Sequence, residues 1–387
     1  METLKYVCVL LMILLSGAIR FYLEWGIIFI PLMLLFGIWL FLRTEEKQNN
    51  ILNALIILLY PLINVLVINP DLTSNFAYSC LLILASGFFI ISSFEFVDFR
   101  EKWLQCVKWL CIISIPIQVL HDIGLIPTGG TDIRGNLTTL FFFNCDWGFS
   151  RLSSIYWECG QFQIVLIYTL LMFTDELVQW NNYQLLIKKF GVIVFALLMT
   201  QSTTGYICLM LLVASLFVFS QNGNMSRRNK ILLMFPLLMV FFVIVNSSAI
   251  QEKILQSQNT EIDNKSSTAI RLQDNLALID IILESPYVGF GLETARLADR
   301  QYYNDSITSS NGWLYSTASL GAVYVLVFIL LMYFRIRENL RGIPALIILG
   351  ICFVSQCNEY IIFLPYMLPF LYEFRSEWDE TYDYEEI

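Results

Sequence analysis

The chain alternates apolar blocks with polar connections, and two of these connections are much longer than the rest. The long polar stretches run from Asp122 to Glu158 and from Asn246 to Gly312. Soluble domains are roughly half apolar, and about a quarter of their residues are charged, whereas this chain is 57% hydrophobic and 14% charged. The pattern therefore predicts an integral membrane protein whose function lies in the two polar stretches.

The apolar blocks are long enough to cross about 30 Å of hydrocarbon as α-helices. They predict about twelve spans in one all-α, polytopic membrane domain covering residues 1–387, with no internal repeat and no soluble domain. The predicted spans are Tyr6–Ile19, Trp25–Leu42, Ile51–Ile68, Phe76–Phe94, Trp103–Leu120, Phe162–Phe173, Leu185–Thr200, Thr204–Ser220, Ile231–Val245, Trp313–Phe334, Ile343–Val354 and Ile361–Tyr372. Several blocks are short, and a re-entrant segment can resemble a span, which leaves the number open by one or two.

Lysine and arginine residues predict the orientation, because cationic loops stay on the cytoplasmic side of a membrane. The alternate connections carry Arg43 and Lys47; Arg100 and Lys102; Lys188 and Lys189; Arg227, Arg228 and Lys230; Arg335, Arg337 and Arg341; and Arg375. Their agreement places both termini in the cytoplasm, including an acidic, solvated tail at 373–387. The two polar stretches are then a first external loop, 122–158, and a large external loop, 246–312. Their few cations run against the usual bias and need an explanation.

The familiar signatures of soluble enzymes are missing from the sequence. His121 is the single histidine, so a site with several histidines is excluded, and no glycine-rich phosphate loop is present for a nucleotide. Asp146 and the acidic residues near 261–263 could hold a divalent ion, but no closely spaced acidic pair faces outward. We therefore expect metal-independent chemistry without a cofactor. Basic patches interleaved with aromatic residues, which bind nucleic acids, are also missing.

A charged pair stands where the first external loop leads into the sixth predicted span. Arg151 and Glu158 lie in the segment that ends at Gln161. An uncompensated charge near hydrocarbon costs roughly 2.5–3.5 kcal/mol on insertion scales. The two residues therefore either form a structural ion pair at the interface or serve a ligand, with the guanidinium binding an anionic headgroup and the carboxylate handling a proton or a cation. Cys145 and Cys159 of the same region could form a disulfide, although their spacing does not establish one.

The large external loop carries a second group of features. Leu276–Leu283 has the apolar periodicity of an amphipathic helix that lies on the membrane surface, and Arg271 precedes it. Pro286 ends this helix. Gly289 and Gly291 then permit either a sharp turn or the close approach of a ligand.

Polar residues open the tenth predicted span. They are Ser309, Ser310 and Asn311, followed by Gly312. The free backbone N–H groups of a helix N-terminus can bind an anion, but serine and asparagine are also the usual capping residues of helices. The sequence leaves both roles open for this segment.

The order of these features resembles the O-antigen polymerase and O-antigen ligase family, membrane glycosyltransferases that act on polyprenyl-diphosphate-linked sugars. The family has an Arg…Glu-Pro-Gly segment before a central span, then Ser-x-Thr-Gly at the start of a helix, then a large periplasmic loop. That loop carries an Arg before an amphipathic helix, Pro-x-x-Gly-x-Gly, and a His-Asn-like turn before a glycine-rich helix start. The similar positions here are Arg151, Glu158–Gly160, Ser202–Gly205, Arg271, Pro286–Gly291, Asn311 and Gly321. The resemblance covers Arg151 to about Phe334, and the first five spans match only in hydropathy.

Two positions depart from the family pattern. Cys159 replaces the usual proline, which changes local geometry only. Ser310 stands where ligases of the family carry a histidine regarded as the catalytic base, and His121, at the end of the fifth span, cannot replace it. The missing histidine favours a repeat-unit polymerase over a ligase.

The resemblance implies a GT-C-like enzyme of the bacterial cytoplasmic membrane. It would polymerise polyprenyl-diphosphate-linked oligosaccharide repeat units into a surface polysaccharide, such as O-antigen, capsule or exopolysaccharide. Donor and acceptor would both be lipid-linked, and a chain-length regulator and a flippase are candidate partners. The alternatives are an O-antigen ligase, a transporter or flippase of lipid-linked or amphiphilic substrates, and an inert scaffold. Transport is disfavoured because the chain shows no related halves and concentrates its charges in the external loops.

Fixed arginine side chains are the natural substitute for a metal at the leaving diphosphate, because guanidinium binds phosphate oxygens bidentately and stays protonated. Arg151 and Arg271 are the predicted diphosphate ligands, with Arg134 third. Glu158 or Glu293 would act as general base on the acceptor hydroxyl. The remaining predicted substrate-binding residues are Gly289, Gly291 and Asn311.

Aromatic side chains of the external loops are candidates for sugar contacts, because their faces suit the C–H surfaces of sugars. At this depth such residues more often form the aromatic belt of a membrane protein. The candidates are Trp147, Tyr156, Trp157, Tyr302 and Tyr303.

Overall fold

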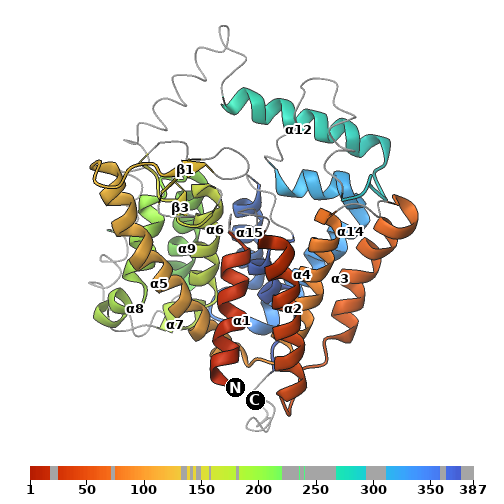
Figure 1. Ribbon diagram of the computed structural model, residues 1–387, viewed down its shortest axis with the longest axis horizontal. Helices are drawn as coiled ribbons and strands as arrows, with labels where there is room; N and C mark the ends of the chain where they lie inside the picture. The colour runs from red at the N-terminus through yellow and green to blue at the C-terminus, as the bar shows by residue number, and fades with distance from the viewer. Residues whose placement is uncertain are drawn as a thin grey trace.

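The computed structural model describes residues 1–17, 25–70, 75–131, 137–139, 143–144, 150–156, 158–179, 183–219, 235, 239, 267–292, 311–357 and 363–375. Within these ranges the chain is mostly helical, and the helices pack side by side as a bundle (Figure 1). A helix satisfies its own backbone hydrogen bonds, which is what an apolar segment needs in hydrocarbon. The helical prediction is therefore confirmed for the described residues.

Most of the predicted spans coincide with helices. Before the first external loop these are α1 (Glu2–Leu15), α2 (Trp25–Arg43), α3 (Ile51–Ile63) with its π-helical continuation η3 (Asn64–Ile68), α4 (Asn75–Ile91) and α5 (Phe96–Asp122). After it come α6 (Cys159–Leu171), the short α7 (Thr174–Gln179), α8 (Tyr183–Met199), α9 (Thr203–Phe219), α14 (Gly312–Asn339) and α15 (Ala345–Gln356). Among the described helices, three are long and apolar enough to cross a membrane: Ile51–Ile68, Phe96–Asp122 and Gly312–Asn339. The total of twelve stays a prediction.

Two predicted spans have a different outcome. Ile231–Val245 lies outside the described residues, apart from positions 235 and 239. Ile361–Tyr372 is wrong as an α-helix in its described part, because Pro365–Phe370 forms the 3-10 helix η5. Prolines at both 365 and 369 explain this, since Pro369 has no N–H to donate to the carbonyl four residues earlier. The segment is instead a buried, non-α part of the core.

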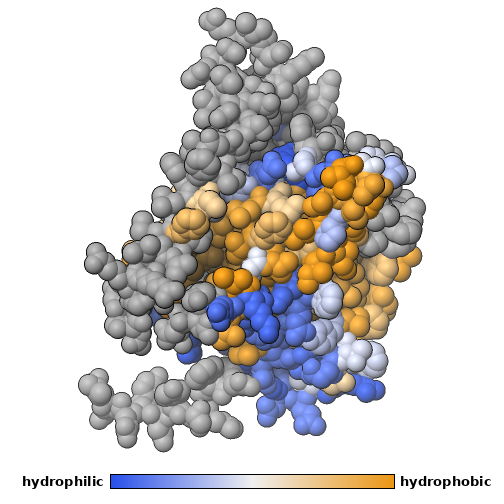
Figure 2. Space-filling view, turned by 90° about the vertical axis from the view of Figure 1, so that its left-hand side faces the viewer, coloured by the Kyte–Doolittle hydropathy of each residue, from blue (hydrophilic) through white to orange (hydrophobic). Residues whose placement is uncertain are grey.

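Apolar side chains cover the outside of the bundle as well as its interior. On α3, Ile51, Leu55 and Leu59 are 58%, 51% and 50% exposed. Figure 2 shows a band of hydrophobic side chains on one face, with hydrophilic side chains gathered below it. A soluble monomer rarely exposes such a surface, so the band supports a membrane-embedded protein.

Cations of the described connections that predicted the orientation gather at one end of the bundle, which we call the terminal end; Arg227, Arg228 and Lys230 lie outside the described residues. There Lys5 of α1 pairs with Asp98 at the start of α5, at 2.6 Å. Arg375, at the other end of the described chain, pairs with Glu46 and Glu95. The neighbouring connections add Arg100, Lys102, Lys189 and Arg335. The structure thus groups these residues as the positive-inside pattern requires, and the cytoplasmic location of this end stays a prediction.

The opposite end, which we call the loop end, carries elements from both external loops. The first loop forms a small antiparallel sheet of β1 (Gly130–Thr131), β2 (Leu137–Thr139) and β3 (Phe143–Asn144), with β2 in the centre. Thr138 pairs with both Gly130 and Asn144. The all-α prediction is therefore wrong at this point. Threonine and phenylalanine favour strands, and a loop outside the hydrocarbon is not restricted to helices.

The large external loop contributes α12 (Ser267–Glu284), which lies across the loop end (Figure 1). The predicted helix is confirmed and begins earlier than Leu276. Leu278 and Ile281 of α12 pack against Tyr315 and Ala318 of α14. The side chain of Leu283 is 71% exposed, so α12 is apolar on its outer side as well. Its location on a membrane surface stays a prediction.

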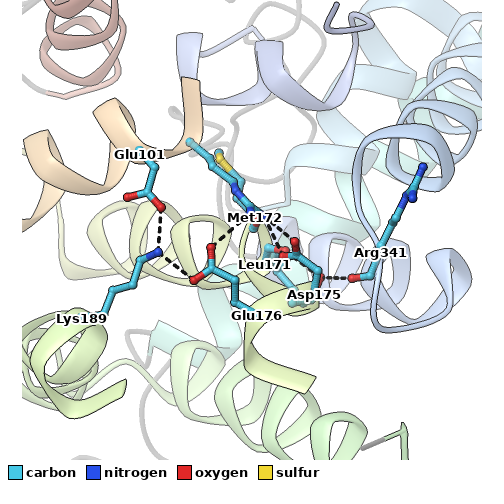
Figure 3. A network of polar contacts seen from close by, with 9 residues as sticks. Glu101, Leu171, Met172, Asp175, Glu176, Lys189 and Arg341 are labelled. Atoms are coloured by element: carbon cyan, nitrogen blue, oxygen red, sulfur yellow. Dashed lines mark hydrogen bonds and ion pairs between the residues drawn. The ribbon is translucent and has the colours of Figure 1, made fainter. Parts of the chain in front are cut away.

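An ion network joins three helices at the terminal end (Figure 3). The side chain of Arg100 on α5 is 8% exposed, and its guanidinium donates to Asp175 at 2.7 Å and to Glu176 at 3.1 Å, both on α7. Lys189 of α8 lies between Glu101 and Glu176, at 2.7 Å from each. The network therefore fixes α5, α7 and α8 relative to one another.

Replacing Arg100 with methionine is expected to destabilise the protein by about 1–3 kcal/mol. Breaking a fully buried ion pair costs about 3–5 kcal/mol, and the penalty is smaller here because the carboxylates of Asp175 and Glu176 are 31% and 37% exposed. The midpoint of thermal unfolding in detergent measures the effect. Lys188→Met, at an exposed neighbouring cation, is the control. Equal midpoints for the two variants would show that the network contributes nothing to stability.

Candidate functional site

Arg151 lies in a segment that is fixed to the turn between α8 and α9. The backbone N–H of Leu152 donates to the carbonyl of Met199 at 3.0 Å. The amide of Gln201 donates to the carbonyl of Ser150 at 3.1 Å. Both chain neighbours of Arg151 are thus held by hydrogen bonds, and the side chain of Arg151 itself is partly exposed. The structure therefore presents this cation at the loop end from a constrained backbone.

The segment between Arg151 and α6 turns through a buried residue with positive φ. Ser154 has φ 57°, a conformation that non-glycine residues seldom adopt. Its hydroxyl lies 2.6 Å from that of Ser114 on α5, and both residues are buried. This contact anchors the turn to α5 and directs the chain into α6.

The two sequence motifs at the starts of α6 and α9 lie together. Glu158 is the N-cap residue of α6: its carbonyl accepts from the N–H of Gln161 at 3.1 Å, and its carboxylate makes no capping bond. Ser202 caps α9 by accepting from the N–H of Gly205 at 3.3 Å. A Cβ on Gly205 would lie 3.0 Å from the side chain of Gln163 on α6. Glycine at 205 therefore permits the close packing of the two helix starts.

The loop Pro286–Gly291 fills a break in α14. The helix is interrupted at Gly321, which has φ 78° and ψ 158°. Backbone hydrogen bonds that join loop and helix run from Phe290 N to Ala318 O (3.0 Å), from Gly291 N to Ser319 O (2.8 Å) and from Ala322 N to Pro286 O (2.7 Å). A break leaves helical N–H and C=O groups without their usual partners. The loop replaces those partners and so becomes part of α14.

Three glycines make this contact possible. A Cβ on Gly321 would lie 2.1 Å from the carbonyl oxygen of Tyr287, and a Cβ on Gly289 would lie 2.5 Å from that of Ser319. Gly289 and Gly291 also have φ of 73° and 97°, which glycine adopts without steric cost. The predicted sharp turn is confirmed, and the close approach observed is to α14. A role of Gly289 and Gly291 in binding substrate stays a prediction.

The first half of the chain holds the same loop from its other side. The hydroxyl of Tyr60 and the amide of Asn64 donate to the carbonyl of Val288 at 2.8 and 3.2 Å. The amide of Asn69 donates to the carbonyl of Gly289 at 3.3 Å. Sequence reasoning missed these three residues, because the first five spans resemble the family only in hydropathy. The available signal was the pair Asn64 and Asn69 at the end of the largely apolar stretch 54–69.

The start of α14 connects the glycine-containing loop with the other motifs. Asn311 is its N-cap and accepts from the N–H of Leu314 at 3.2 Å, so the capping alternative is confirmed. Trp313 stacks on Phe353 of α15 with ring centroids 4.9 Å apart, and its indole N–H donates to the carbonyl of Phe353 at 3.0 Å. Helix α15 in turn contacts α6 and α9. The motif-bearing helices therefore form one packed unit. A role of Asn311 in binding substrate stays a prediction.

Several predicted site residues lie outside the described part of the chain. Arg134 and Glu293 are among them, and so is the side chain of Arg271, whose backbone belongs to α12. Cys145 is another, so the disulfide with Cys159 stays open. Within the described ranges, no group of three or more His, Cys, Asp or Glu side chains could hold a metal ion. The metal-independent mechanism remains a prediction.

The prediction that Tyr156 meets sugars is wrong. The side chain of Tyr156 is fully buried and stacks on Phe162, with ring centroids 5.4 Å apart. Its hydroxyl donates to the carbonyl of Ile13 at 3.4 Å, so it faces the core of the bundle. The other aromatic candidates, Trp147, Trp157, Tyr302 and Tyr303, lie outside the described residues.

Comparison with known proteins finds a family match for the middle of the chain. Residues 190–316 match the family model for O-antigen ligase. The matched range begins in α8, includes α9 and α12 with the Pro286–Gly291 loop, and ends within α14. No curated protein matches the sequence. The match confirms the resemblance that the motifs predicted, whereas Arg151, Glu158 and the α3 contacts lie before the matched range.

Proposed function

Because residues 190–316 carry an O-antigen ligase domain, we propose that this chain polymerises polyprenyl-diphosphate-linked oligosaccharide repeat units into a surface polysaccharide. The reaction would take place at the outer face of the bacterial cytoplasmic membrane, with both termini inside. The observation that carries the proposal is the position of the motifs. The starts of α6 and α9 pack against each other at the loop end, opposite the cluster of cations, and the Pro286–Gly291 loop packs against α14, which α15 joins to α6 and α9.

The chemistry follows from the residue types at that end. The hydroxyl oxygen of the acceptor sugar attacks the anomeric carbon of the donor, and the bond from that carbon to the phosphate oxygen breaks. The polyprenyl diphosphate leaves with the bonding electrons. Arg151 and Arg271 stabilise its negative charge, and Glu158 or Glu293 accepts the proton of the attacking hydroxyl. Direct attack of this kind inverts the anomeric configuration.

The carboxylate of Glu158 is suited to the role of general base by its position. It belongs to the N-cap residue of α6 but makes no capping bond. Its backbone is fixed by the turn that leads from Arg151. A carboxylate whose backbone is fixed and whose oxygens do not cap the helix can accept a proton from a bound hydroxyl.

Polymerase activity is favoured over ligase activity by one position in the sequence. Ser310 stands where ligases of the family carry a histidine, and the single histidine, His121, lies in the last turn of α5. Its imidazole lies 3.3 Å from the hydroxyl of Thr128, so it is held beside the first external loop. The acceptor is thus proposed to be a second lipid-linked oligosaccharide rather than a lipid A core.

The purified protein is expected to lengthen polyprenyl-diphosphate oligosaccharides in the presence of a metal chelator, without ATP or nucleotide sugar. The energy for the new bond is already stored in the bond between sugar and diphosphate. Gel electrophoresis and mass spectrometry of the lipid-linked products measure chain length. Glu158→Gln should slow extension without abolishing donor binding, because the amide keeps the shape but cannot accept a proton.

The alternative functions predict different results in this assay. Transfer to a lipid A core without lengthening of the lipid-linked chain would identify a ligase. Movement of the substrate across a vesicle membrane without a new glycosidic bond would identify a transporter. A strict requirement for a divalent ion would overturn the arginine-based mechanism.

A further inference from the structure

We infer that the loop end of α3, through Tyr60, Asn64 and Asn69, holds the Pro286–Gly291 loop in the position that glycosyl transfer requires. The inference rests on the proposed function. It assigns a positioning role to residues in the part of the chain that precedes the O-antigen ligase match. These residues would act through the loop rather than on the substrate.

The loop is held from two sides by complementary groups. The N–H groups of Phe290 and Gly291 are taken by carbonyls of α14. The carbonyls of Val288 and Gly289, which point the other way, accept from three side-chain donors at the end of α3. A polar backbone in a packed environment needs a partner for each group, and a missing partner is costly. Helix α14 thus pairs with two donors and one acceptor of the loop, and the end of α3 supplies donors to two further acceptors.

The π-helix at the end of α3 brings the two asparagines to the same side. Residues five apart in an α-helix, such as Asn64 and Asn69, point about 140° away from each other. Here the N–H of Asn69 donates to the carbonyl of Asn64 at 2.7 Å, which closes a π-type turn. Their side-chain amides are also 3.4 Å apart. This rare conformation, which is frequent at functional sites, gives the loop two amide donors where an α-helix would give one.

The end of α3 is itself fixed to α14 close to the break. Tyr60 stacks on Tyr324 with ring centroids 5.4 Å apart. The hydroxyl of Tyr324 donates to the carbonyl of Ile57 at 3.0 Å. Tyr324 is three residues beyond Gly321, where the helix is broken. Helix α3, the loop and α14 therefore support one another, and a shift of α3 would move the loop.

The position of the loop along the chain gives this support a functional consequence. The loop follows α12, which contains Arg271, and it ends two residues before Glu293. These are the predicted diphosphate ligand and a predicted general base of the large external loop. Holding the loop fixes part of the segment that joins these two residues in the sequence.

The double variant Tyr60→Phe/Asn69→Asp tests the inference. It removes one donor and replaces another with an acceptor that repels the carbonyl of Gly289. Asn69 is partly exposed, so a carboxylate there can remain solvated and the fold is retained. Asn339→Asp is the matched control, because the amide of Asn339 donates to the carbonyl of Tyr372 at 3.2 Å at the terminal end.

Two measurements are made on the full-length protein in detergent. Hydrogen exchange of the peptide covering residues 285–292 should become about tenfold faster in the double variant, which is the effect of losing one or two hydrogen bonds. The rate of chain extension at saturating lipid-linked donor should fall by about the same factor. The control should change neither, and Tyr60→Phe alone should lie between the control and the double variant.

The outcomes separate the inference from the proposed function. Unchanged exchange at 285–292 in the double variant would show that α3 does not hold the loop. Faster exchange with an unchanged extension rate would show that the reaction does not need the loop in this position. If the wild-type protein extends no chain at all, the proposed function fails, and the exchange measurement still decides whether α3 holds the loop.

Discussion

Replacing Gly321 with alanine is expected to expel the Pro286–Gly291 loop from α14 and to abolish chain extension. The added Cβ would lie 2.1 Å from the carbonyl oxygen of Tyr287 and 2.3 Å from its carbon, both of which are backbone atoms that cannot rotate away. Alanine at φ 78° is also strained, which costs about 1–3 kcal/mol by itself. Since the loop and the helix share hydrogen bonds at this point, both must give way.

The test compares two glycine-to-alanine changes in neighbouring helices. Gly350 of α15 has open space around the position of a Cβ and an ordinary φ, so Gly350→Ala should be neutral or stabilising by about 0.5–1 kcal/mol. Thermal unfolding, hydrogen exchange at 285–292 and chain extension are measured for both variants. A Gly321→Ala protein with normal exchange and full extension would show that the observed break in α14 is not needed.

Replacing Arg151 with lysine is expected to reduce polymer about a hundredfold while the amount of protein in the membrane stays normal. Loss of one fixed donor to a developing negative charge typically has an effect of about 10²–10³ on the rate. Lysine keeps the charge but loses the planar fork that binds two phosphate oxygens. Because the neighbours of Arg151 are held by Met199 and Gln201, the backbone cannot shift readily to bring a shorter point charge to the same place.

Arg43→Lys is the control for this substitution. Arg43 is a cation of the terminal end, and its guanidinium lies 5.2 Å from the ring centre of Trp39. Polymer should stay at the wild-type level in this variant. Arg271→Lys should behave like Arg151→Lys if both hold the diphosphate. Normal polymer in both the Arg151 and the Arg271 variants would remove the arginines from the proposed mechanism.

Features that depend on neighbouring residues were predictable from the sequence. The hydropathy of a whole block predicted the positions of α5 and α14, because every apolar residue of the block adds to the summed hydropathy. Pro286 and the two glycines after it indicated the end of α12 and a turn, since these residues restrict or free φ locally. Asn311 could be proposed as a cap for the same reason. The span at Ile361–Tyr372 failed because hydropathy does not distinguish a membrane helix from a buried 3-10 segment.

Contacts between distant residues were beyond the reach of the sequence. Nothing local indicates that Tyr156 stacks inside the bundle, because its burial depends on α1 and α6 together. The same holds for the segment before α6, which forms hydrogen bonds with the turn between α8 and α9. Ser150 and Gln201, for example, are 51 positions apart in the sequence. Residue type alone identified Arg151 as a candidate, and tertiary contacts determined how it is held.

The sequence by itself determined that the chain is mostly helical and apolar and that its middle part resembles the O-antigen ligase family, because hydropathy and short motifs are carried by adjacent residues. Only the tertiary structure decided what the glycines of the large external loop do. Gly289 and Gly321 are needed because two backbones meet there, and the hydrogen bond from Tyr60 to the loop joins residues 228 positions apart. Such a contact depends on how whole helices pack, and no segment of the chain encodes it alone.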